Sequence, residues 1–185
     1  LEHVPDPRQV VTEIRRILKP GGRIAVSVPN FSSFQARVSG PAWFHLDSPR
    51  HLHHFSLRGL RRLLEDAGFE IESEHHFSLR QNPFGWLQSA LNRTGWFPRN
   101  ALYSLLKNAE CEGIRSLSLL KRLALRSCYL LGMPLAIAFS VAETVLRSGA
   151  SVSMIARSQS AGGSNRAKSS SRAEHGNEML AAVER

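Results

Sequence analysis

The chain has 185 residues, of which 42% are hydrophobic and 21% are charged. This balance excludes a chain that is disordered throughout and a fibrous protein. The two cysteines, Cys111 and Cys128, exclude a disulfide-stabilised scaffold and favour a reducing compartment. Lysine and arginine outnumber aspartate and glutamate by 24 to 15, and residues 81–156 hold eight of these cations but three of the anions. Such an excess indicates either a solvated basic face or an anionic partner.

The first residues show no pattern of a signal peptide. The chain starts at Leu1 rather than at methionine, and no basic segment is followed there by an apolar one. We therefore expect a cytoplasmic protein, and we expect the chain to be part of a longer one.

The first predicted element is a helix over residues 7–18. Asp6 can cap its N-terminus, Pro7 suits its first position, and its apolar residues recur at helical spacing. The Pro20–Gly22 turn ends it. Residues 23–28, RIAVSV, then predict a strand buried on both faces, as in the interior of a parallel sheet.

Residues 31–55 have no clean periodicity and hold several aromatic residues and four histidines, which predicts a functional or partly helical loop. Ser56 can cap a second amphipathic helix, which ends near Gly68. Residues 69–77 then partly alternate and predict a strand with one wetter face.

Residues 82–148 are mostly helical in pattern, with breaks expected near Pro83, Gly95, Pro98, Gly113 and Pro134. The run Cys128–Ala142 carries no charge, but it is shorter than the roughly 20 residues of a membrane-spanning helix. It therefore predicts a buried or membrane-surface helix. Residues 151–156 predict a last strand, and the Gly/Ser-rich residues 158–185 predict a disordered tail.

Three segments together carry a family resemblance: LEHVPDP at the start, LKPGGRIAVSVPN, and LRRLLEDAGFEI. The chain resembles the C-terminal half of a class I S-adenosylmethionine-dependent methyltransferase, in the group that includes quinone-biosynthesis enzymes. The resemblance implies an α/β fold with a Rossmann-like, doubly wound sheet whose last strand is antiparallel. It divides the chain into half of the core (1–81), a helical acceptor-side insertion or cap (82–148), the last strand (149–157) and the tail (158–185).

The resemblance also places two short segments on the ligand face of that sheet. Leu1, Glu2 and His3 would follow the fourth strand and contact S-adenosylmethionine, with His3 orienting a loop. Asn30 and Phe31 would follow the fifth strand and contact the substrate, because ligands of open α/β sheets bind at the carboxyl ends of the strands. Alternatively, Asn30 belongs only to a strand-ending turn.

The glycine-rich loop with which the family binds its cofactor is missing from these 185 residues. Gly21 and Gly22 follow a helix rather than a strand, so we assign them to a turn. We therefore expect this chain alone to bind S-adenosylmethionine weakly or not at all, and to be inactive alone.

The loop at 43–55 holds the best candidates for substrate handling. A hydroxyl acceptor loses a proton on methylation, and a histidine titrating near neutrality suits that task, so we predict His51, and after it His45, as general base. Arg50 can pair with an anionic acceptor. Trp43 and Phe44 can face a sulfonium or stack on an aromatic acceptor. Structural roles for these aromatic residues and histidines remain the alternative.

Other partners follow from the same residues. Ligand-type side chains lie between His45 and His54, but their spacing fits no compact zinc pattern, so we predict no metal. The absence of a recognisable module predicts no nucleic acid. Residues 115–146 join a basic amphipathic helix to the apolar run, which suits a cap over the acceptor pocket or a peripheral membrane contact.

The function implied by the resemblance is methyl transfer from S-adenosylmethionine to a small-molecule acceptor, at oxygen. One alternative is a membrane-peripheral methyltransferase acting on a lipid or quinone. Another is a non-catalytic, truncated module. The sequence predicts neither the acceptor nor the oligomeric state.

Overall fold

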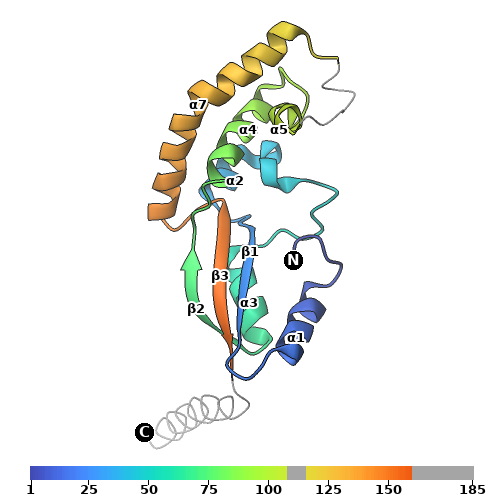
Figure 1. Ribbon diagram of the computed structural model, residues 1–185, viewed down its shortest axis with the longest axis vertical. Helices are drawn as coiled ribbons and strands as arrows, with labels where there is room; N and C mark the ends of the chain where they lie inside the picture. Colours follow the sequence, from blue (N-terminus) through green and yellow to red (C-terminus); the bar gives the residue numbers. More distant parts are fainter. Residues whose placement is uncertain (108–115, 160–185) are drawn as a thin grey trace, which may run out of the picture.

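A computed structural model describes residues 1–107 and 116–159. A small sheet occupies one end of the molecule and a group of helices the other (Figure 1). The sheet has three strands in the order β1-β3-β2. The mixed α/β class and the helical insertion before the last strand are as predicted, while the predicted tail, from residue 160 onward, lies outside the described residues.

Helix α1 (Pro7–Ile17) forms as its capping residue predicts. The Asp6 carboxylate accepts a hydrogen bond from the Gln9 amide at 3.0 Å, which satisfies one of the free amides of the first turn. Val11 is fully buried against the sheet. Gly21, with φ of +74°, then turns the chain into strand β1 (Arg23–Pro29).

Strand β1 is not buried on both faces, and that prediction was wrong. Ile24, Val26 and Val28 are buried while the residues between them are exposed, and among the described residues only β3 pairs with β1. The sequence RIAVSV suggested a strand buried on both faces because its exposed residues Ala25 and Ser27 are small and nearly neutral in hydropathy. An alternating strand whose exposed positions hold small residues is hard to distinguish from a continuous apolar run.

Helix α3 (Leu57–Asp66) begins at Ser56, whose hydroxyl accepts from the Gly59 amide at 3.0 Å. It leads through Gly68 into strand β2 (Phe69–His75), which is two residues shorter than predicted. Strand β3 (Ser151–Ser158) lies between β1 and β2 and is antiparallel to both, so the predicted antiparallel last strand is confirmed. It extends one residue beyond the predicted boundary at 157.

The loop between β1 and α3 is partly helical, as predicted. It holds α2 (Phe34–Ser39) and two short 3-10 turns, Gly40–Ala42 and Phe44–Leu46. Trp43, between the turns, is fully buried, and its indole nitrogen donates to the Gln35 side-chain oxygen at 3.0 Å. Trp43 therefore anchors the loop.

The helical part comprises α4 (Asn82–Thr94), α5 (Ala101–Leu106) and α7 (Leu119–Val145). They share a small apolar core made of Leu91, Ala101, Leu102, Leu117 and Leu125. One expectation about α7 was wrong, because the helix continues through Pro134 instead of breaking there. Its apolar run was predicted to be either buried or at a membrane surface, and the exposure of most of the run contradicts the buried alternative. Gly113 and Cys111 lie outside the described residues.

Candidate functional site

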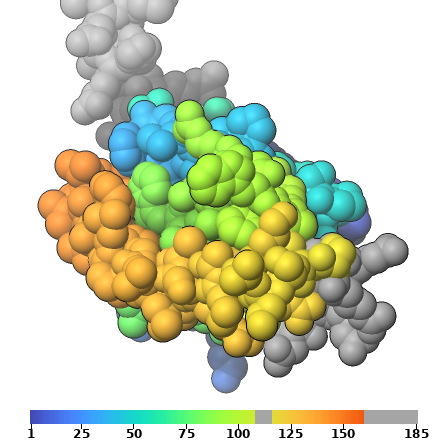
Figure 2. Space-filling view, turned by 90° about the horizontal axis from the view of Figure 1, so that it is seen from above, coloured from blue at the N-terminus to red at the C-terminus, as the bar shows by residue number. Residues whose placement is uncertain are grey.

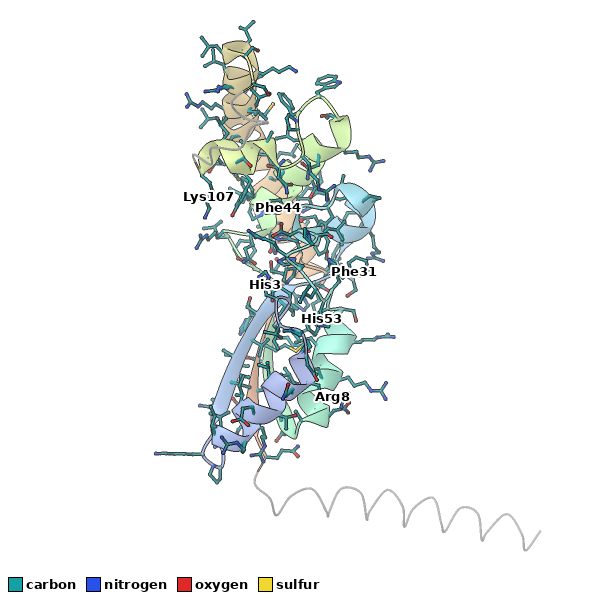
Figure 3. All side chains as sticks on the ribbon, turned by 90° about the vertical axis from the view of Figure 1, so that its right-hand side faces the viewer. His3, Arg8, Phe31, Phe44, His53 and Lys107 are labelled. Carbon is teal, nitrogen blue, oxygen red and sulfur yellow. The ribbon has the colours of Figure 1, made fainter. Side chains whose placement is uncertain are left out.

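A cavity of about 540 Å³ lies between the end of the sheet and the helices. Figure 3 labels His3, Phe44 and Lys107, which lie around this region and come from three separate parts of the chain. The lining residues used below are Glu2, His3, Pro29, Phe44, His45, Asp47, Arg50, His51, Arg80, Phe84, Tyr103 and Lys107.

The first residues and the end of β1 meet at this cavity. Glu2 and His3 line it together with Pro29, the last residue of β1. The Leu52 amide donates to the Glu2 carbonyl at 2.8 Å, so the histidine-rich loop is held against the first residues. Two segments that the sequence placed on one ligand face therefore share one cavity with that loop.

His51 is held in a defined orientation. Its Nδ1 lies 2.8 Å from the His45 carbonyl oxygen, and its side chain is 8% exposed. Because a carbonyl can only accept, Nδ1 carries the proton and Nε2 keeps its lone pair in the neutral ring. Asp47 lies 3.9 Å from that Nε2 and can stabilise the ring when it becomes charged. His51 thus has the orientation of a general base.

His45 is in a different state. It is buried, and this burial together with the nearby His51 lowers the pKa of His45 to about 4. Its Nε2 has no hydrogen-bond partner among the described residues. The imidazole is therefore neutral at neutral pH and a weak base, so the geometry favours His51 over His45 for proton removal.

Helix α4 approaches His45 closely because it has a glycine at position 85. A Cβ at Gly85 would lie 2.8 Å from His45 Nε2 and 2.5 Å from the Gln35 side-chain oxygen. Both distances are shorter than van der Waals contact, so no larger residue fits without a shift. The absence of a side chain at Gly85 thus lets α4 pack directly against Gln35 and His45 of the loop.

Glu2, His3 and His51 could together hold a metal ion. Each offers one ligand atom, and these atoms lie within 4.8 Å of one another. His3, like His51, has its Nδ1 against a backbone carbonyl, that of Arg50 at 3.0 Å, as metal-bound histidines commonly do. The sequence predicted no metal because only the local spacing between 45 and 54 was considered, whereas this group joins residues nearly 50 positions apart.

The wall formed by the helices is aromatic and basic. The ring of Phe44 lies 5.2 Å from that of Phe84 and 5.4 Å from that of Tyr103, measured between centroids. Arg80 and Lys107 add positive charge at the exposed edge of the cavity. The sequence analysis missed the residues from α4, α5 and their flanks, although the excess of cations in residues 81–156 was a signal for this face.

Arg50, which was predicted to bind the substrate, lines the cavity but is already engaged. Its Nε lies 3.0 Å from the Asp47 carboxylate. An anionic acceptor would therefore compete with Asp47 for the guanidinium group.

Four predicted site residues do not line this cavity. Asn30 is buried and donates to the Gly149 carbonyl at 3.0 Å, and Trp43 is buried in the loop. Leu1 packs against the apolar core of the sheet, and the half-exposed Phe31 stands beside His54. The binding roles assigned to these four stay predictions, and their positions favour structural roles.

Comparison with known proteins bears on the family. Residues 1–74 match the model of a family described as a methyltransferase domain. This match supports the class I S-adenosylmethionine-dependent methyltransferase that the sequence resembles. A Mycolicibacterium smegmatis protein named as a probable enzyme of this kind is 39% identical over 72 residues, which cover 39% of this chain and 26% of the relative.

Other relatives match the same part of this chain. A ubiquinone biosynthesis O-methyltransferase of Thiobacillus denitrificans is 36% identical over 78 residues, which cover 39% of this chain and 34% of that enzyme. The chain thus spans about a quarter to a third of the length of these curated relatives. Among solved structures, the cyclase SpnF is 17% identical with a TM-score of 0.41, over 85% of this chain and 46% of that chain.

Proposed function

We propose that this methyltransferase transfers a methyl group from S-adenosylmethionine to an oxygen of a small aromatic acceptor that carries a negative charge. One observation carries the proposal. The family-matched residues Glu2, His3 and Pro29 line the same cavity as His51, whose Nε2 is available to take a proton.

S-adenosylmethionine, when bound, supplies the methyl group, whose carbon bonds to the acceptor oxygen as its bond to sulfur breaks and the electron pair stays on sulfur. The part of this chain is to prepare the acceptor. His51 Nε2 takes the hydroxyl proton, and Asp47 stabilises the imidazolium that forms. The remaining contribution is positioning, because the acceptor oxygen must be held in line with the methyl carbon.

The acceptor class follows from the wall of the cavity. Phe44, Phe84 and Tyr103 offer ring faces and edges on which an aromatic molecule can stack. Arg80 and Lys107 attract an anionic substituent, and Arg50 can bind one if Asp47 releases it. The printed name of the Thiobacillus denitrificans relative, an O-methyltransferase, supports oxygen as the acceptor atom.

The test is methyl transfer by the protein encoded by the complete gene, with tritium-labelled S-adenosylmethionine and 3,4-dihydroxybenzoate as acceptor. Replacing His51 by alanine should lower kcat at least about tenfold, because a positioned general base contributes about 10²–10⁴ in rate. The matched control is His75→Ala, since His75 is exposed at the end of β2.

Two outcomes would contradict the proposal. Equal rates for the wild type and His51→Ala would remove His51 from the mechanism. Absence of transfer by the wild-type protein would exclude this acceptor class.

A further inference from the structure

Helix α7 exposes an unusual amount of apolar side chain for a surface helix. Its buried residues are Leu125, Ala136, Ser140 and Glu143, of which two are polar, while many of its leucines and valines are exposed. The exposed fractions reach 80% for Leu131, 78% for Leu120 and 77% for Val145. Exposed apolar surface that is contiguous along a whole helix marks a contact site rather than random surface composition.

The outward side of α7 is also free of charge over most of its length. Glu143 is the only charged residue between Arg126 and Arg147. Its carboxylate is buried on the inner side of the helix. There it accepts hydrogen bonds from the backbone amide of Gln35 at 2.7 Å and from the indole nitrogen of Trp86 at 2.9 Å. Residues 127–146 therefore present an uncharged face about 30 Å long.

No other described element covers this face. In Figure 2, the orange-to-yellow spheres of α7 form a continuous ridge along one side of the molecule. At the ends of the uncharged face stand exposed cations, Lys121 and Arg126 near the start of the helix and Arg147 just after its end. The surface thus combines an apolar strip with basic groups at both ends.

We propose that α7 lies in the plane of an anionic phospholipid membrane, with its outward leucines among the acyl chains and its cations at the headgroups. An anionic membrane surface can bind both parts of this face, because its acyl chains contact the apolar residues and its phosphates attract the basic groups. A second copy of the chain fits less well, because its α7 would bring the same cations and no exposed carboxylate.

The contacts of α7 favour a helix that lies on the membrane over one that crosses it. Leu125 packs in the same small core as Leu91 of α4 and Leu102 of α5, and Glu143 is held by Gln35 and Trp86. By length and composition alone α7 could cross a membrane. A crossing would strip these contacts away and leave the Glu143 carboxylate to face hydrocarbon, whereas side-on binding preserves them.

The experiment is co-sedimentation of the 185-residue protein with vesicles of phosphatidylglycerol and, separately, of phosphatidylcholine. We expect at least about tenfold more binding to phosphatidylglycerol, because the basic groups add electrostatic attraction to the apolar contact. The double variant Leu131→Glu, Leu135→Glu should lose this binding. Ile17→Glu is the matched control, because Ile17 is a similarly exposed apolar residue on α1.

Thermal unfolding and light scattering distinguish the remaining explanations. The double variant should melt close to the wild-type temperature, because both leucines are mostly exposed and have little packing to lose. Equal binding to both vesicle types, or unchanged binding by the double variant, would overturn the proposal. A wild-type dimer that dissociates in the double variant and ignores vesicles would assign the face to a second copy instead. None of these readouts depends on methyl transfer.

Discussion

His45 and His51 lie six residues apart on one loop, yet the fold gives them different chemistry. His51 has its Nδ1 fixed by a backbone carbonyl and an acidic neighbour near its Nε2. His45 is enclosed by the loop and α4, and the cost of burying a charge lowers the pKa of His45 to about 4. The sequence identified both residues, but it could not rank them by burial, because burial is set by α4, nearly 40 residues further along the chain.

The low pKa of His45 predicts a loss of stability in mild acid. In the unfolded chain a histidine binds a proton near pH 6.5, whereas folded His45 does so only near pH 4. The unfolded state therefore binds more protons between these values, and the free energy of unfolding falls as the pH falls through this window. Burial also lowers the pKa of His76, which acts in the same direction.

The variant His45→Gln isolates the contribution of His45. From pH 7 to pH 5 its free energy of unfolding should fall by about 2 kcal/mol less than that of the wild type, because glutamine does not titrate. Urea unfolding at both pH values measures this, with His75→Gln as the exposed control. Equal falls for His45→Gln and the wild type would show that His45 is not buried as described.

Among the elements, those with strong local signals were predictable. Asp6 and Ser56 cap the helices that they were predicted to cap, because capping depends only on residues within three positions. The edge position of β1 depends on which elements pair with it and cover it, and its own residues do not report this. Pro134 was predicted to break a helix, but α7 continues through it. The packing of α7 against α4 supports the helix there, and the local sequence does not report this packing.

The close packing of α4 against the loop at Gly85 predicts that a single added methyl group there lowers stability. Gly85→Ala should lower the free energy of unfolding by about 1–3 kcal/mol, because its Cβ would collide with Gln35 and His45 inside a packed region. Gly132→Ala is the control in α7, since its Cβ meets only the end of the flexible Leu87 side chain. Chemical denaturation of both variants tests this. Similar stabilities for the two would mean that Gly85 has no special role.

At the scale of the whole molecule, the sequence predicted the sheet side of the site better than the helical side. Glu2 and His3 belong to a segment that carries the family resemblance, and His51 lies within the family-matched residues. All three meet at the cavity. Tyr103 on α5 and Lys107 at its end reach the same cavity from beyond the family-matched residues. Which side of such a helix faces inward depends on tertiary packing. For the same reason the charge-free run at 128–142 did not reveal that its apolar side points outward.

The central claim is that the end of the sheet beside Glu2 and His3 forms part of an S-adenosylmethionine site, and calorimetric titration tests it most directly. S-adenosylmethionine should bind the protein encoded by the complete gene with a dissociation constant on the order of micromolar. This corresponds to a binding free energy of about −8 kcal/mol. Glu2→Ala should weaken binding at least about tenfold, or roughly 1.4 kcal/mol, whereas the exposed Glu70→Ala on β2 should bind as the wild type does. Residues 1–185 alone should bind weakly or not at all. No binding by the complete gene product, or equal binding by Glu2→Ala and the wild type, would contradict the claim.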